Sequence, residues 1–278
     1  MKDITESKIQ EFENYLCLNE KSKATVKKYV KAVQCLAGFL EGAELTKQSL
    51  LKYREYLQAK NKVQTVNGML SAINAFLDFC GWQECRIKFL KVQRQAFLQE
   101  SRELSKEEYK RLLTAALAKK NERLYLLMLT VCSTGIRISE LVYITVEALE
   151  NGRAEICMKG KNRTIILQKE LRKKLLKYAK MQGIKSGHIF RTKSGKPLDR
   201  SNIYHDMKKL SKEANVDAEK IFPHNLRHLF ARTFYAIEKN LAHLADVLGH
   251  SRIETTRIYV AASVTAHEKI LSSMKLVI

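Results

Sequence analysis

The feature that most constrains this fold is the spacing of apolar residues, which recur every three or four positions through much of the chain. The clearest run covers 26–40, where the apolar positions that share one helical face are Val26, Tyr29, Val30, Val33, Leu36, Ala37 and Leu40. The 278 residues include only two prolines, Pro197 and Pro223, so few helices need to be interrupted. The pattern therefore predicts a mainly α-helical protein.

The first third of the chain is expected to form a separate helical domain. Further apolar faces centre on 9–16, 50–57 and 66–77, which with 26–40 predict four helices within residues 1–92. Ser22 is the expected N-cap of the second helix. The periodicity breaks over 93–100, and a helix resumes after Ser105, which has the capping-box spacing to Glu108. We expect domains at 1–92 and 101–278, joined by a linker at 93–100.

The second domain is predicted to be mixed α/β but mostly helical. Two short β-prone runs, 153–158 and 163–167, flank residues 159–162, which read as a hairpin turn. Helices are expected elsewhere, at about 106–119, 121–133, 138–143, 169–182, 200–214, 224–238, 241–248, 252–261 and 264–274. The sheet is therefore expected to be small.

Charge points to a polyanionic partner. Fifty lysines and arginines against 29 aspartates and glutamates give a net charge of +21, most of it beyond residue 92. Such an excess in a folded protein indicates nucleic acid rather than a membrane surface. A cationic run at the start of the second predicted helix serves either as a solvated face or as a grip on DNA phosphates. This run comprises Lys21, Lys23, Lys27, Lys28 and Lys31.

Several classes of protein are disfavoured. No apolar stretch approaches the roughly 18–20 residues that span a bilayer, and the N-terminus lacks the apolar run of a signal peptide. The six cysteines are scattered without zinc-ligand spacing. We expect a cytoplasmic protein with buried free thiols, no membrane segment, no metal and no cofactor.

Three short clusters carry residues suited to phosphoryl transfer. Thr134–Leu141 contains Arg137, Pro223–His228 contains His224 and Arg227, and Leu248–His250 is followed by Tyr259. Arginine binds phosphate oxygens through a planar fork, and histidine moves protons near neutral pH. A tyrosyl hydroxyl, with a pKa near 10, becomes a nucleophile when a base or strong donors lie nearby.

Each of these residues also has an ordinary structural alternative. A lone arginine is usually a surface or salt-bridged cation, and His224 or His250 could cap or end a helix. Tyr259 is one of 11 tyrosines, most of which belong to the core. Lys159 and Lys161, at the expected hairpin tip, either protonate a leaving 5′ oxygen or are solvated. The ordered combination is what predicts attack on a DNA phosphodiester.

Taken together, these motifs resemble the tyrosine recombinase, or phage-type integrase, family, which includes chromosome-dimer resolvases and transposon integrases. The resemblance covers nearly the whole chain. Supporting segments outside the three clusters are Ser22-x-x-Thr25-x-x-x-Tyr29, Asn67-x-x-Leu70-Ser71-Ala72 and Phe190-x-x-x-x-Gly195-Lys196-Pro197-Leu198. The resemblance implies an N-terminal, SAM-like core-binding bundle and a mostly helical catalytic domain with a small β-sheet.

The resemblance also implies a role for each residue. Arg137 and Arg227 would clamp the scissile phosphate, His224 would assist the nucleophile, and His250 would donate to a non-bridging oxygen. Tyr259 would form a 3′-phosphotyrosine bond. Glu140 would orient its neighbours, and Lys159 would be the general acid. The hairpin is shorter than is usual in the family, so Lys161 stays an alternative acid. Lys161 and Arg163 are also expected to contact DNA.

The implied function is site-specific recombination of double-stranded DNA carrying paired sites. We expect a homo-tetramer on DNA, joined through an amphipathic C-terminal helix at 266–278, with or without a related recombinase or accessory protein. Two other functions fit the same residues less well. One is a type IB topoisomerase-like relaxing enzyme, and the other is a non-catalytic DNA-binding regulator.

Overall fold

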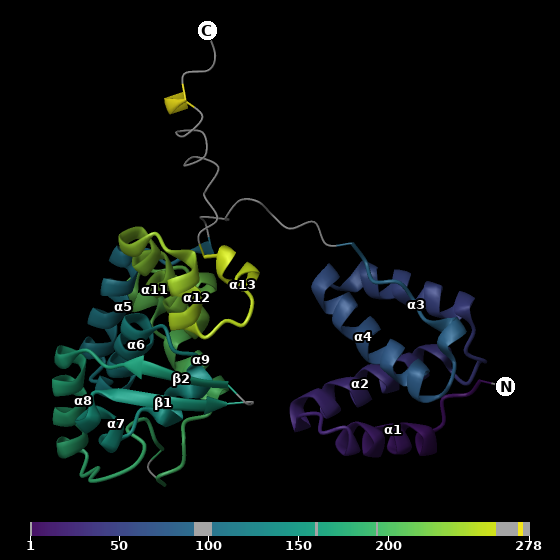
Figure 1. The fold of residues 1–278 in the computed structure, drawn as a ribbon, viewed down its shortest axis with the longest axis horizontal. Coiled ribbons are helices and arrows are strands. Elements are labelled where there is room, and N and C mark those ends of the chain that lie inside the picture. The colour runs from purple at the N-terminus through teal and green to yellow at the C-terminus, as the bar shows by residue number, and fades with distance from the viewer. Residues whose placement is uncertain (1, 92–101, 159–160, 193, 260–271, 275–278) are drawn as a thin grey trace. The chain divides into compact units, whose positions relative to one another are not determined.

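The computed structural model describes residues 2–91, 102–158, 161–192, 194–259 and 272–274. The chain divides into two compact units, Met1–Arg94 and Gln95–Ile278, each with its own apolar cores. Figure 1 shows that most described residues are helical and that a two-stranded sheet lies in the second unit. The expected fold class is therefore confirmed.

Helices make up the N-terminal unit. Its described elements are α1 (Glu6–Leu18), α2 (Lys23–Leu40), α3 (Lys47–Lys60), α4 (Val63–Phe79) and the 3-10 helix η1 (Gln83–Cys85). α2 packs against the other three long helices. It begins where the sequence predicts, because the Ser22 hydroxyl accepts a hydrogen bond from the Thr25 N–H at 3.3 Å.

Two asparagines on α4 hold the chain that follows η1. The buried Asn74 accepts from the Ile87 N–H at 3.0 Å and donates to the Ile87 carbonyl at 2.9 Å. Asn67 makes the same pair of bonds with Leu90, at 2.8 and 2.9 Å. A side-chain amide thus satisfies backbone groups that no neighbouring strand reaches.

The second unit is built around α6, which contacts α5, α8, α9 and α11. Its described elements are α5 (Lys106–Ala118), α6 (Glu122–Thr134), η3 (Ile138–Tyr143), α7 (Val146–Asn151), β1 (Arg153–Met158), β2 (Lys161–Ile166), α8 (Lys169–Met181), α9 (Arg200–Lys208), α10 (Ser211–Ala214), η4 (Ala218–Lys220), α11 (Pro223–Glu238), α12 (Leu241–Leu248) and α13 (Glu254–Arg257).

The helix expected over 200–214 is instead two helices, α9 and α10. Arg111 of α5 donates to the Ala214 and Asn215 carbonyls and so fixes the end of α10. α7 was not predicted, and it is a short helix capped by Thr145, whose hydroxyl accepts from the Ala148 N–H at 3.2 Å. The helix expected over 252–261 is limited to α13 among the described residues. Most of the one expected over 264–274 lies outside them.

The sheet is an antiparallel hairpin. Met158 pairs with Lys161 and Cys157 with Asn162, so β2 begins two residues earlier than expected. Along β1, Ala154 and Ile156 face the core, while the alternate side chains are exposed. The hairpin thus packs one face of β1 on the second unit's core.

Two expectations about composition can be compared with the structure. No helix among the described residues is long and apolar enough to cross a membrane. All six cysteines are free, as expected, but Cys17, Cys35 and Cys157 are exposed rather than buried. They lie on the outward faces of α1, α2 and β1, which the apolar periodicity did not separate from the inner faces.

Candidate active site

The ends of three helices meet in the second unit. α11 starts with Pro223, which suits a first helical position because it has no N–H to satisfy. His224, Arg227 and His228 then follow at the spacing that places side chains on one face. α6 and α12, which both contact α11, end at Gly135 (φ +65°) and Gly249 (φ +64°). This left-handed conformation favours glycine.

Arg227 is fixed by the carbonyls at these helix ends. The residue is 1% exposed. Its Nη1 donates to the Gly135 carbonyl, and its Nη2 donates to the Leu248 carbonyl at 2.7 Å and to His250 Nε2 at 3.0 Å. The partial negative charge at a helix C-terminus stabilises a cation there. Its Nε is buried and has no hydrogen-bond partner among the described residues.

The surroundings weaken the basicity of Arg227 without removing its charge at neutral pH. Burial lowers its pKa to about 10, and the positive charges of Arg137 and Arg163 act in the same direction. The Tyr259 hydroxyl opposes this shift by charge and by hydrogen bonding. The guanidinium and the phenol are therefore close neighbours.

A buried carboxylate organises the other two arginines. The Glu140 side chain is 4% exposed and accepts from the Arg137 N–H at 2.7 Å, from Arg137 Nη1 at 2.9 Å and from Arg163 Nη2. Burial by itself would raise the pKa of Glu140, but these bonds and charges outweigh it and lower the pKa. Glu140 is therefore an anion that orients both guanidinium groups.

Arg137 and Arg163 differ in exposure. Arg137 is 40% exposed, and its Nη2 lies 3.3 Å from the Gly249 carbonyl, so it remains open to a ligand. Arg163 is 12% exposed, and its Nη1 donates to the Val247 carbonyl at 2.8 Å. Arg163 therefore ties β2 to Glu140 and to the end of α12. This is an internal setting, unlike that expected of a contact to the DNA backbone.

Tyr259 lies among three imidazoles. Its side chain is buried, with the residue 2% exposed. The His250 ring stacks on it at 5.8 Å between centroids, the His228 ring meets it edge-on at 4.7 Å, and the His224 ring lies 6.4 Å away. His224 itself is exposed. The predicted nucleophile thus lies beside every histidine of the predicted clusters.

Hydrogen bonding sets the protonation of His250. A guanidinium only donates, so the Nε2 of His250 accepts from Arg227 and its proton is on Nδ1, which donates to the Thr256 hydroxyl at 2.9 Å. Burial, followed by the charges of Arg227 and Arg137, lowers the pKa of His250 to about 4. Desolvation, His228 and Arg227 also lower the pKa of His224 to about 4. Both imidazoles are neutral at pH 7.

The predicted lysines are only partly placed. Lys159 lies outside the described residues, and for Lys161 the structure gives the backbone position at the start of β2. The five N-terminal lysines are all exposed. Four of them line a groove between α1 and α2, namely Lys21, Lys23, Lys27 and Lys31. Lys28 instead lies over Gly68 on α4.

Sequence reasoning missed two polar partners of this site. Thr256 is buried and holds His250, and Glu103 reaches His228 at 3.3 Å from a position 125 residues away. The spacing of His224 and His228 hinted that both face the site. Nothing in the sequence marked Glu103.

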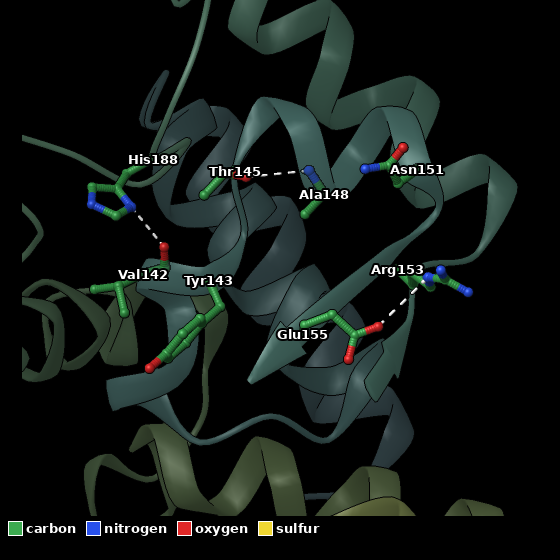
Figure 2. Close-up of a pocket in the computed structure, with 8 residues that line it drawn as sticks. All are labelled: Val142, Tyr143, Thr145, Ala148, Asn151, Arg153, Glu155 and His188. Atoms are coloured by element: carbon green, nitrogen blue, oxygen red, sulfur yellow. Dashed lines mark hydrogen bonds and ion pairs between the residues drawn. The ribbon is translucent and has the colours of Figure 1, made fainter. Parts of the chain in front are cut away.

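A separate hollow lies on the outer side of β1, against η3 and the start of α7. Figure 2 shows His188 and Thr145 on one side of it and Arg153 and Glu155 on the other. It shares no residue with the site around Tyr259. Its polar groups are largely paired within the protein, since His188 bonds the Val142 carbonyl at 2.6 Å and Arg153 pairs with Glu155 at 3.5 Å. These bonds stabilise the fold.

Comparison with known families gives a consistent result. The model of the phage integrase family matches residues 102–265, and that of the phage integrase N-terminal SAM-like domain matches residues 9–84. The tyrosine recombinase XerA of Thermococcus kodakarensis is 28% identical over 281 residues, covering 97% of this chain and 95% of the relative. The TnP I resolvase of Bacillus thuringiensis is 26% identical, covering 90% and 93%.

Solved structures share the fold. The XerH site-specific recombinase bound to its difH substrate has a TM-score of 0.72 at 19% identity, covering 97% of this chain and 84% of that one. A lambda integrase tetramer bound to a Holliday junction has a TM-score of 0.74 at 17% identity, covering 91% and 76%.

Proposed function

This chain belongs to the phage integrase family, the tyrosine recombinases, which cut and rejoin DNA, and we propose that it recombines specific sites through a covalent link to Tyr259. The observation that carries the proposal is that arginine and histidine side chains from different segments gather around Tyr259. Arg227 and the three histidines surround one buried tyrosine, and Arg137, from a distant segment of the sequence, lies 3.3 Å from the Gly249 carbonyl next to His250. An ordinary core tyrosine has no need of such neighbours.

The two arginines would bind the scissile phosphate. Arg137 is partly exposed and oriented by Glu140, while Arg227 is rigidly held and its Nε has no hydrogen-bond partner in the part of the chain that the structure describes. Planar guanidinium groups donate to two phosphate oxygens at once. Attack adds negative charge to those oxygens, so preorganised cations stabilise the transition state more than the bound substrate.

The reaction would consist of two reversible transesterifications. The Tyr259 oxygen attacks phosphorus, the bond from phosphorus to the 5′ oxygen breaks, and a 3′-phosphotyrosine forms. His224, neutral and exposed beside Tyr259, helps to remove the phenol proton. Lys159, or Lys161 in its place, protonates the leaving 5′ oxygen. The number of phosphoester bonds is unchanged, so rejoining needs no nucleotide hydrolysis.

His250 would change its proton position when DNA binds. In the free protein its Nε2 accepts from Arg227, so it cannot donate to a phosphate oxygen. The Thr256 hydroxyl can either accept from Nδ1 or donate to it. Thr256 therefore supports both tautomers. We propose that phosphate bound by Arg227 draws the proton to Nε2, which then donates to a non-bridging oxygen.

The exposed N-terminal lysines would hold the DNA backbone, and their contacts would make binding depend on salt. A homo-tetramer on paired sites is proposed because the lambda integrase structure is a tetramer on a Holliday junction. The proposed contact between subunits is residues 266–278, most of which lie outside the described ranges. We also propose that the protein works in the cytoplasm, alone or with a related recombinase or accessory protein.

Covalent trapping tests the chemistry and the target together. The full chain is mixed with nicked, fragmented DNA of its source, denatured in detergent, and the attached DNA is sequenced, with Tyr259→Phe as the matched control. Attachment by the unsubstituted protein alone, at one recurring site, is the expected result. Attachment at sites without common sequence would indicate a topoisomerase-like enzyme. Tight binding without attachment would indicate a DNA-binding regulator and contradict the proposal.

A further inference from the structure

A carboxylate and an imidazole form a second arrangement beside Tyr259 that the steps above do not use. Glu103 Oε1 lies 3.3 Å from His228 Nδ1, and Glu103 Oε2 lies 3.3 Å from Arg232 Nε. The side chains of Glu103 and His228 are 12% and 17% exposed, so solvent screens their interaction little. The same His228 ring meets the Tyr259 ring edge-on at 4.7 Å.

This contact sets the proton position on His228. A carboxylate only accepts, so the Nδ1 of His228 carries a proton and donates it to Glu103. In the tautomer that carries only this proton, Nε2 has a lone pair. That nitrogen is buried and has no hydrogen-bond partner among the described residues. A buried acceptor without a donor is costly, so its retention beside an ionisable phenol suggests that it receives a proton.

The segment that carries Glu103 is fastened to the helix that carries His228. The buried Asn225 donates to the Arg102 carbonyl at 3.0 Å, and Arg232 Nη2 donates to the Leu104 carbonyl at 2.6 Å. Both donors belong to α11, which also presents His224 and Arg227. Hydrogen bonds to the backbone carbonyls on either side of Glu103 thus hold its carboxylate next to the His228 imidazole.

We propose that Glu103 and His228 form a proton-accepting pair for Tyr259, in which His228 is the proton acceptor and Glu103 is the positioning residue, an inference that rests on the proposed function. As the Tyr259 oxygen bonds to phosphorus, its proton passes to His228 Nε2, directly or through the His224 ring 4.6 Å away. The phosphorus–5′ oxygen bond breaks, and the 5′ oxygen takes its proton from the hairpin lysine. Glu103 stabilises the imidazolium so formed, and rejoining returns each proton.

The groups that face this pair determine its pH dependence. His228 faces Glu103, His224 and Tyr259, and Glu103 also faces Arg232. Burial would raise the pKa of Glu103, but His228, Arg232 and His224 outweigh it and lower the pKa. Glu103 is therefore ionised throughout the neutral range. A pH effect on cleavage in that range is therefore not expected to come from Glu103.

The test is single-turnover cleavage of a nicked duplex bearing the site recovered by trapping, measured from pH 6 to 9.5. We expect Glu103→Gln to slow cleavage about 10–100-fold at pH 7, since a general base contributes at least that much. The deficit should shrink as the pH rises, because hydroxide from the solvent can then take the phenol proton in place of the pair. Affinity for the same duplex should change less than about twofold, since the pair is not a phosphate contact.

A matched control and a second variant keep the result interpretable. Glu108→Gln removes an ion pair of similar burial, Glu108–Lys220 at 2.9 Å, away from Tyr259, and should leave the pH profile unchanged. His228→Gln should reproduce the Glu103→Gln profile, and the double variant should be no slower than either, as expected of residues that act as a unit.

Two failures are distinguishable. If the unsubstituted protein forms its covalent adduct, the inference is overturned when both variants slow cleavage equally at every pH or do not slow it at all. Absence of any adduct with unsubstituted protein would instead contradict the proposed function.

Discussion

Replacing Arg163 with methionine separates an internal role for this residue from a role in DNA binding. In the structure, Arg163 donates to Glu140 and to the Val247 carbonyl, and it is 12% exposed. Methionine keeps much of the side-chain volume but removes both donors. We expect a large loss of stability in the second unit.

The size of the loss follows from the bonds removed. Taking away one partner of a buried ion pair costs about 3–5 kcal/mol, but Glu140 keeps two bonds from Arg137, which lowers that part to about 2 kcal/mol. The Val247 carbonyl loses a donor, which costs about 1 kcal/mol. Together, the free energy of unfolding should fall by about 3 kcal/mol at pH 7.

Urea unfolding of the full chain is a suitable assay because tryptophan fluorescence and circular dichroism report on different structural units of the protein. The single tryptophan, Trp82, lies in the N-terminal unit, so its fluorescence should follow that unit, whereas circular dichroism follows both. Arg163→Met should move the unfolding of the second unit, which is seen by circular dichroism but not by Trp82 fluorescence, to lower urea concentration. The Trp82 transition is the internal control and should not move.

The pH dependence adds a second check. The folded pKa of Glu140 is lowered from 4.5, so its ionic contribution is present above that value and is lost as the pH falls. The difference between Arg163→Met and unsubstituted protein should therefore narrow below pH 4.5. If the variant had unchanged stability but bound DNA more weakly, with the slope of log binding constant against log salt concentration reduced by about 1, it would refute this reasoning. That result would indicate that Arg163 contacts a DNA phosphate.

Three further predictions concern the same site. Gly249→Ala should lower the free energy of unfolding by about 2–4 kcal/mol, because at φ +64° the added Cβ would lie 2.5 Å from the Arg163 side chain. Gly183 has the same φ but open space around it, so Gly183→Ala should cost only about 1 kcal/mol. The folded pKa of His250 lies near 4, below its usual 6.5, so stability should fall as pH drops from 6.5 to 4, by about 0.5 kcal/mol per pH unit after allowing for partial exposure. That slope should decrease by about this amount in His250→Gln, leaving the contribution of His224, whose pKa is also near 4, and an unchanged slope would contradict the assigned neutral ring. Finally, a substrate with sulfur at the bridging 5′ position needs no general acid, so it should rescue cleavage by Lys159→Met but not by Tyr259→Phe; rescue of Lys161→Met instead would assign the acid to Lys161.

Local signals in the sequence were sufficient for most elements of the fold. Apolar spacing located α1 to α6, and the caps at Ser22 and Ser105 depend on residues only three positions away. The motifs around Arg137, His224 and His250 were sufficient for the family, because each is short and their order is distinctive. Where packing rather than spacing decides, as at the break between α9 and α10, prediction failed.

The sequence by itself therefore determined the fold class and the family. The partners within the site were decided only by tertiary structure. Arg163 became an ion-pair partner of Glu140, the proton of His250 was assigned by Arg227, and Glu103 came to His228 across 125 residues. The physical reason is that a hydrogen bond depends on the distance and direction between two atoms. Residues far apart in the chain acquire these only when the helices that carry them have packed.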